Sequence, residues 1–205
     1  EKQILVITHS SFVANKLGLD CLTLLNDRKP VKMDGLSPDT KKFFEKIQGY
    51  DTLRLILCDK AILVEGDSDE LVIQKAYMTA NGGKLPIEDR IDVISVGVSF
   101  LRFLEIADKL SQRVCVVTDN DGDIESLEKK YCDYLGDNAK ANITIHYDDE
   151  IDIGELKLGD RKFNYNTLEP KFLKANGFNH TKKILGVEYD KIDDLHKYMK
   201  SNKTE

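Results

Sequence analysis

The stretch Ala61–Glu70, with the sequence AILVEGDSDE, decides the fold of this protein. Its first four residues, 61–64, are apolar and predict a buried β-strand. Glu65 and a glycine follow as a turn, since glycine accommodates backbone conformations that other residues avoid. Asp69 then opens an amphipathic segment, which predicts a helix over residues 69–80. A buried strand that leads directly into a helix is the repeating unit of α/β proteins.

The same alternation of strand and helix continues to about residue 147. Strands are predicted over 61–64, 92–96, 114–117 and 143–147, and helices over 69–80, 100–110 and 124–136. This spacing favours right-handed βαβ units in an open parallel sheet. From residue 155 the strand signals stop, and Lys-rich amphipathic helices follow. We therefore expect an α/β fold, a parallel sheet flanked by helices, with a C-terminal helical appendage.

A separate pattern precedes this unit. Residues 3–8 are rich in β-branched side chains and predict a buried strand, which needs neighbouring strands on both sides. A helix is expected over 10–19 and a second strand over 21–25. Residues 26–37 indicate a turn-rich connection, after which we place a domain boundary. A helical pattern then covers residues 38–59.

Composition and charge limit the classes of function. Of the 205 residues, 41% are hydrophobic and 32% are charged, which is typical of a globular protein. The formal net charge of -6 and the pI near 5.3 exclude a broadly basic surface that would bind nucleic acid by bulk electrostatics. Four cysteines without a C-x-x-C pair favour a reduced, cytoplasmic location. No apolar run approaches the ~18 residues of a membrane span, so we expect no membrane partner.

Two acidic clusters follow predicted strands, at the edge where open parallel sheets gather their functional groups. Glu65 and Asp69 follow the first strand of the sheet, and Asp119 and Asp121 follow the third, within VVTDNDGD at 116–123. Carboxylates at adjacent strand ends repel each other unless cations lie between them, and oxygen ligands favour Mg²⁺, Mn²⁺ or Ca²⁺. We therefore expect some of the excess acidic residues to form a metal site.

Other interpretations of these acids compete with a metal site. Acids at the start of a helix could cap it or interact favourably with its dipole. An EF-hand loop beginning at Asp119 would need Gly at its sixth position and Glu at its twelfth, where the chain has Ile124 and Lys130, so this interpretation fails. A phosphatase of the haloacid dehalogenase type, with Asp119 as nucleophile and Asp121 as acid/base, leaves Glu65 without a role.

The order of these motifs resembles the Toprim domain, a Rossmann-like domain shared by type IA and II topoisomerases, primases and several nucleases. The resemblance covers roughly residues 55–150 and is carried by Val64-Glu65-Gly66, by a strand–helix unit with Gly97, and by Asp119-x-Asp121 after an apolar strand. The chain departs from the common pattern after Gly97, where the family often has a second Gly or a Lys. We assign no function to that turn.

Other segments resemble more specifically the OLD family of nucleases, in which an ATPase domain precedes the Toprim domain. They are the spacing from Glu65 to Asp69, the segment Asn166–Pro170 and the terminal Asn202–Glu205. Residues 4–10 resemble the last strand and the switch histidine of an ABC-type ATPase. Gabija-type antiviral nucleases are built in the same way, so the chain is similar to them too.

The resemblance implies the roles of individual residues. The metal ligands would be Glu65, Asp69, Asp119, Asp121 and Glu169, holding two Mg²⁺ or Mn²⁺ ions. Glu65, Asp119 and Lys203 would be catalytic. In the family, a lysine in a K-x-E pattern, here Lys203 with Glu205, stabilises charge on the scissile phosphate. His9 would sense a nucleotide only together with the remainder of an ATPase domain. The chain has no phosphate-binding loop, so we expect ATP to bind only to the full-length protein.

These expectations define four segments and one leading function. The segments are a remnant of an ABC-type ATPase domain (1–37), a helical linker (38–59), a Toprim catalytic domain (60–154) and a helical appendage (155–205). The leading function is that of a metal-dependent endonuclease that nicks or cleaves DNA, working as a homo-oligomer through the full-length protein. One alternative is a Toprim domain of a topoisomerase or primase-like enzyme. Another is a catalytically silent metal-binding module used for dimerisation or regulation.

Lysines and tyrosines offer further candidate contacts to DNA. The lysines are Lys171, Lys174, Lys182, Lys183, Lys191, Lys197, Lys200 and Lys203, and they form either a local basic surface or an ordinary solvated helical face. Tyr131, Tyr134 and Tyr165 could stack on bases, although tyrosines at helical spacing more often pack against a core.

Overall fold

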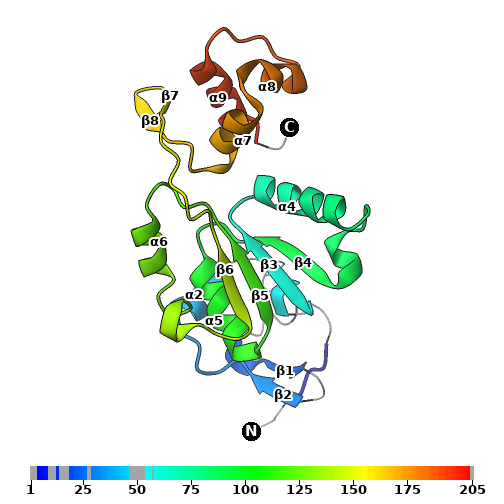
Figure 1. Ribbon diagram of the computed structural model, residues 1–205. Helices are drawn as coiled ribbons and strands as arrows, with labels where there is room; N and C mark the ends of the chain where they lie inside the picture. Colours follow the sequence, from blue (N-terminus) through cyan, green and yellow to red (C-terminus); the bar gives the residue numbers. More distant parts are fainter. Residues whose placement is uncertain are drawn as a thin grey trace.

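The computed structural model describes residues 4–8, 13, 19–26, 29–46, 54–56 and 58–203. A four-stranded sheet with its helices forms the middle of the molecule (Figure 1). The helical appendage, coloured yellow to red, lies at one end of the sheet, and a blue hairpin near the N-terminus lies at the other. The α/β fold and the C-terminal appendage predicted from the sequence are confirmed.

The central sheet is parallel and has the strand order β4-β3-β5-β6. Its strands are β3 (Lys60–Val64), β4 (Ile91–Ser95), β5 (Arg113–Val117) and β6 (Ile143–His146). Each lies within two residues of its predicted position, because an apolar run between turn signals is a strong indication of a buried strand. β3 pairs with both β4 and β5, so Glu65, which follows β3, lies next to the turns that follow its two neighbours.

Helices connect these strands across both faces of the sheet. They are α4 (Asp67–Ala80), α5 (Phe100–Leu110) and α6 (Ile124–Lys130), with short 3₁₀ helices at Pro86–Asp89 and Gly136–Asn138. The chain moves one position along the sheet from β3 to β4 and two positions back to β5. Because both crossovers are right-handed, α4 and α5 cover opposite faces (Figure 1).

The main hydrophobic core lies between the sheet and α5. Phe100 and Phe103 of α5 are almost completely buried, and Phe103 packs edge-to-face against Phe44 with the ring centroids 5.3 Å apart. Tyr131 also lies in this core, which agrees with packing rather than base stacking as its role. The helix predicted to reach residue 136 ends at Lys130, because turns begin at Tyr131.

The appendage contains a hairpin that the sequence analysis did not predict. β7 (Leu156–Leu158) and β8 (Arg161–Phe163) pair antiparallel, so the expectation of helices alone after residue 155 was wrong. Three-residue strands are too short to show a clear period, but Gly159, with φ of 63°, followed by Asp160 is a typical two-residue hairpin turn. The helices α7 (Leu168–Asn176), α8 (Phe178–Leu185) and α9 (Ile192–Ser201) follow.

The N-terminal region differs most from the predictions. Residues 4–8 form no strand, and Ile4, Leu5 and Ile7 are more than four-fifths exposed, so the buried strand predicted over residues 3–8 was wrong. A strand needs a partner for its backbone groups, and no strand in the described part of the chain pairs with these residues.

The neighbouring segments agree in part with the sequence. A 3₁₀ turn at Leu19–Cys21 precedes β1 (Thr23–Asn26), which pairs antiparallel with β2 (Lys29–Lys32) inside the predicted connection. A two-stranded ribbon has free outer edges, so it accepts Pro30 in β2. The helical pattern over 38–59 corresponds to α2 (Pro38–Lys46) and to helical residues 54–56. The helix expected over 10–19 falls almost entirely outside the described residues.

No helix in the described ranges combines the length and the apolar character that a membrane crossing requires.

Candidate metal centre

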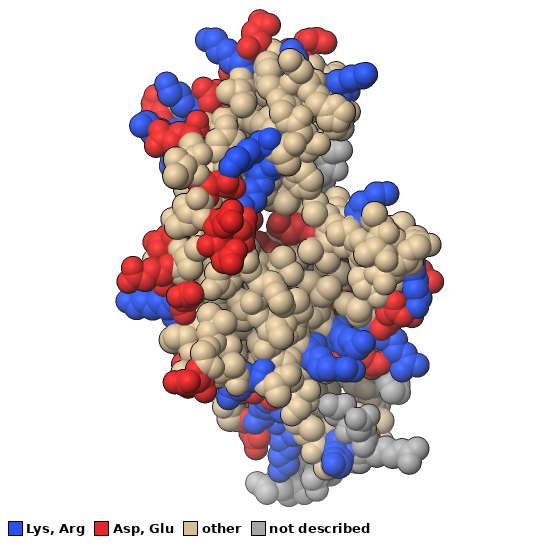
Figure 2. All heavy atoms as spheres, in the orientation of Figure 1, with Lys and Arg blue, Asp and Glu red and all other residues tan. Residues whose placement is uncertain are grey.

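A cavity of about 470 Å³ lies where the carboxyl ends of the sheet strands face the appendage. Figure 2 shows acidic side chains gathered around the hollow between these two parts of the molecule. The charged side chains that line the cavity are Glu65, Asp67, Asp69, Asp119, Asp121, Glu169, Lys200 and Lys203. All five acids predicted as metal ligands, together with Lys203, therefore line one cavity, although they come from four separate segments of the chain.

The first acidic cluster is shaped by the turn between β3 and α4. Glu65 directly follows β3, and Gly66 precedes the first residue of α4. The Asp69 carboxylate accepts a hydrogen bond from the Gly66 backbone N–H at 2.9 Å. This bond satisfies a helix N-terminus and holds the Asp69 side chain against the turn, on the side of Glu65. A capping role and a place in the cavity are thus compatible for the same residue.

The second acidic cluster sits in a tight turn after β5. Asp121 has φ of 51° and Gly122 has φ of 77°, so two successive residues adopt the left-handed conformation. The Asn120 side-chain oxygen accepts a hydrogen bond from the Gly122 N–H at 3.0 Å, which stabilises this turn locally. Asp119 and Asp121 consequently both line the cavity, while the Asn120 side chain between them is buried.

Glu169 and two lysines form the appendage side of the cavity. The Glu169 side chain is 9% exposed, and its two oxygens lie 2.8 Å from Lys200 Nζ and 3.2 Å from Lys203 Nζ. Lys200 also contacts Thr167 Oγ1 at 3.3 Å and is only 18% exposed, whereas Lys203 is 54% exposed. Sequence reasoning missed Lys200, because nothing in its spacing distinguishes it from the other lysines of α9.

The two sides of the cavity differ in their electrostatics. Partial burial raises the pKa of Glu65, and the neighbouring Asp121 and Asp69 raise it further. Burial and the nearby Asp69 carboxylate raise the pKa of Asp119 to about 7. Burial also raises the pKa of Asp69. The pKa of Glu169 is lowered despite its burial, because Lys200 donates a hydrogen bond to its carboxylate.

Three of these acids also line a second, smaller cavity. A space of about 110 Å³ lies against Glu65, Asp69 and Asp119 and is otherwise lined mainly by apolar side chains, Val72 and Ile73 among them. Carboxylates between an apolar wall and one another are poorly solvated and mutually repulsive. A cation in the larger cavity would relieve both effects.

The donor set fits a hard divalent cation. All five candidate ligands are carboxylates, which Mg²⁺, Mn²⁺ and Ca²⁺ prefer. In the part of the chain that the structure describes, no three His, Cys, Asp or Glu side chains are close enough together to hold an ion. The ligand assignment stays a prediction.

The remaining candidates lie in different places. His9 and Glu205 fall outside the described residues. Lys171 forms ion pairs with Asp148 and Asp152, and Lys174 also pairs with Asp152, so acids of the same chain already occupy part of the predicted basic surface.

The tyrosines agree with packing rather than base stacking. Tyr134 packs against the main core, and Tyr165 packs against the small core of the appendage.

One comparison with known proteins gave a match. Residues 56–121 match the family described as Overcoming lysogenization defect protein-like, TOPRIM domain. The match begins before β3 and ends at Asp121, so it includes four of the five predicted ligands but not Glu169 or either lysine. Searches of curated proteins and of solved structures returned no match. A domain of this family indicates a metal-binding module of the nuclease type.

Proposed function

Residues 56–121 are a Toprim domain of the OLD-like family, and from this premise we propose that the protein is a divalent-metal-dependent DNA endonuclease. The observation that carries the proposal is the convergence of five carboxylates and two lysines on one cavity. The family match covers the sheet side of this cavity only. Glu169, Lys200 and Lys203 reach it from the appendage, so the fold completes a charged site beyond the matched segment.

The proposed roles follow from position and charge. Glu65 and Asp69 would hold one divalent ion, while Asp119, Asp121 and Glu169 would hold a second ion or lie between the two. When bound, such a pair of ions supplies activation of the attacking water and neutralisation of the leaving 3′-oxygen. Lys203, with its ammonium group half-exposed at the cavity, approaches the scissile phosphate and stabilises its developing negative charge.

The other lysines near the cavity have roles that differ from that of Lys203. Lys200 is largely buried on Glu169, so it holds that carboxylate in place rather than reaching the substrate. Lys171 and Lys174 are engaged with Asp148 and Asp152. DNA that approaches this surface competes with those acids, so we expect binding that weakens steeply with salt.

The wider context of the proposal rests on sequence resemblance alone. It comprises regulation by an ATPase part that binds ATP, assembly as a homo-oligomer, a cytoplasmic location and an antiviral role similar to that of Gabija-type nucleases.

Plasmid nicking tests the proposed activity. Supercoiled plasmid is incubated with the protein and Mg²⁺, Mn²⁺ or Ca²⁺, and nicked and linear products are quantified. We expect cleavage with Mg²⁺ or Mn²⁺, its loss in EDTA, and background rates for Glu65→Ala and Asp119→Ala. Glu125→Ala removes an exposed acid that does not line the cavity and should retain the wild-type rate.

Two outcomes of this experiment would overturn the assignment. Nicking by Glu65→Ala or Asp119→Ala at near the wild-type rate would show that these acids are not the ligands. Tight binding of one Ca²⁺ per chain without nicking would instead favour the silent metal-binding module.

A further inference from the structure

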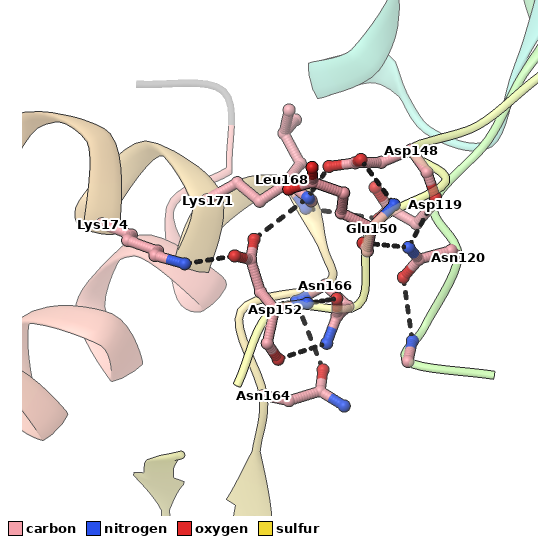
Figure 3. A network of polar contacts seen from close by, with 11 residues as sticks. Asp119, Asn120, Asp148, Glu150, Asp152, Asn164, Asn166, Leu168, Lys171 and Lys174 are labelled. Carbon is pink, nitrogen blue, oxygen red and sulfur yellow. Dashed lines mark hydrogen bonds and ion pairs between the residues drawn. The ribbon is translucent and has the colours of Figure 1, made fainter. Parts of the chain in front are cut away.

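We propose that Asn120 and Asn166 are positioning residues that set the carboxylates of Asp119 and Asp121 against Glu169. The inference rests on the proposed function, because it concerns how the two sides of the same metal site are held together. Figure 3 shows the polar network that contains both asparagines. Neither residue lines the cavity, and neither is charged.

Asn120 links the turn after β5 to the loop that follows β6. Its side chain is 1% exposed, and its amide N–H₂ donates to the carbonyl oxygens of Asp148 at 2.7 Å and Glu150 at 2.9 Å. Its side-chain oxygen accepts from the Gly122 N–H. All three bonds hold backbone groups, so the amide fixes the turn that carries Asp119 and Asp121 rather than another side chain.

Asn166 links the same loop to the start of α7. It is fully buried, its side-chain oxygen accepts from the Asp152 N–H at 2.7 Å, and its amide donates to the Asp152 carbonyl oxygen at 3.1 Å. This pair of bonds docks residue 166 on the loop as a strand partner would. Lys171 and Lys174 of α7 pair with the Asp152 carboxylate and so attach the helix to the same loop (Figure 3).

The chain of contacts ends at the metal ligands themselves. The Leu168 N–H, two residues after Asn166, donates to Asp119 Oδ2 at 3.3 Å, and Glu169 is the next residue. The start of α7 is therefore placed directly against the second acidic cluster. Gly122 shows how close this approach is, since a Cβ built on it would clash with the side chain of Asn164.

The chemistry of asparagine suits both positions. The loop offers carbonyl oxygens as acceptors and N–H groups as donors, and an amide side chain satisfies both kinds of group. An aspartate of the same shape would turn a negative oxygen toward the carbonyls and add a buried charge beside carboxylates that already repel one another. Asparagine thus connects the two sides of the site without changing its charge.

Asn142 provides a matched control at the other end of the sheet. Its amide also donates to two backbone carbonyls, those of Ala107 at 3.3 Å and Gln112 at 2.9 Å. It lies just before β6, at the amino end of that strand, and does not line the cavity. Asn142→Ala therefore removes comparable hydrogen bonds without touching the connection between Asp119 and Glu169.

The test compares Asn120→Ala, Asn166→Ala and Asn142→Ala in the full chain. Mn²⁺ binding is measured by calorimetry, and plasmid nicking is measured across Mn²⁺ concentrations. We expect Asn120→Ala and Asn166→Ala to need a roughly ten- to hundredfold higher Mn²⁺ concentration for half-maximal nicking, since residues that orient metal ligands typically contribute this much. Raised Mn²⁺ should restore most of the rate. Asn142→Ala should keep the wild-type Mn²⁺ dependence, even where its melting temperature falls.

The controls separate this inference from the proposed function. Wild-type protein that neither binds Mn²⁺ nor nicks DNA would overturn the function, whereas active wild type with an unchanged Mn²⁺ dependence in both variants would overturn the inference alone. A rise in the Mn²⁺ requirement no larger than that of Asn142→Ala would also overturn the inference. If either variant fails to fold, Asn164→Ala removes only the acceptor for the Asn166 N–H and should raise the Mn²⁺ requirement by a smaller factor.

Discussion

The partly buried acids on the sheet side and on the appendage side of the cavity have pKa values shifted in opposite directions. Glu65, Asp69 and Asp119 at the sheet edge have raised pKa values, because partial burial and mutual repulsion disfavour their charged forms. Glu169 on the appendage has a lowered pKa, because two lysines of the same chain neutralise it. Protonation or a cation from solution would relieve the repulsion on the sheet side, whereas the appendage side supplies its own cations.

The two sides also rest on cores of very different size. Among the described residues, the main core holds 19 buried residues and the core of the appendage holds three, Leu156, Leu173 and Leu195. A small core stabilises its elements weakly, so the appendage should open more often than the sheet. Glu169 and Lys203 therefore depend on the part of the molecule with the smaller core.

The largest expected effect comes from weakening the core of the appendage. Leu173→Ala should cost about 2–5 kcal/mol there, because it leaves a cavity in a cluster that has few other buried side chains. Hydrogen exchange followed by mass spectrometry should show faster exchange in α7–α9 and unchanged exchange in α5. Leu104→Ala is the matched control in the main core and should accelerate exchange throughout the sheet domain. If Leu173→Ala and Leu104→Ala accelerated hydrogen exchange in α5 equally, the appendage would not open separately from the sheet.

Replacing Lys203, the more exposed of the two lysines, tests whether it stabilises transition-state charge while Lys200 only holds Glu169 in place. Lys203→Ala should lower the nicking rate at saturating Mn²⁺ by about 10²–10³-fold, the usual loss when one group that stabilises transition-state charge is removed. Its Mn²⁺ affinity should hold or rise, because Glu169 loses a competing ammonium group. Lys197→Ala removes an exposed lysine from α9, the helix that precedes Lys203, and should have little effect. A Lys203→Ala rate within a few-fold of wild type would leave the lysine without a catalytic role.

The smallest effect concerns the stability of the metal-free protein. Asp119 has a pKa of about 7 in the folded chain and about 4 in an unfolded one, so the folded state binds its proton more tightly. The stability that this proton contributes is complete below about pH 4 and is lost as the pH rises to about 7. Asp119→Asn has no charge to lose, and its amide oxygen can still accept from the Leu168 N–H.

Melting in EDTA checks the sign of this effect. Asp119→Asn should melt above wild type at pH 8, and the difference should vanish near pH 4. The same variant should not nick DNA. A difference that is independent of pH would show that the Asp119 charge does not destabilise the metal-free fold.

The sequence allowed the sheet and its acidic edge to be predicted, because both depend on local patterns. An apolar run bounded by turn residues marks each of the four parallel strands, and the acids follow β3 and β5 directly in the chain. The strand order β4-β3-β5-β6, which only the structure gives, then places Glu65 beside Asp119.

Predictions failed where a segment depends on distant partners. Residues 4–8 have the composition of a buried strand, but no described strand pairs with them, so composition alone did not make a strand. The three-residue strands β7 and β8 exist because they pair with each other, and neither is long enough to show a period of two. Lys200 and Asn166 gained their roles only when α7 and α9 folded against the sheet edge.

By itself, the sequence determined which residues could serve the site: carboxylates placed directly after buried strands, and a lysine near the C-terminus. Only the tertiary structure decided that Lys200 as well as Lys203 neutralises Glu169, and that Asn120 and Asn166 join the two acidic sides. The physical reason is that strand ends are positioned by local periodicity and sheet pairing. Contacts between residues 14 to 34 positions apart, such as those of Asn166 and Lys203, depend on how separate elements dock, and no local pattern records that docking.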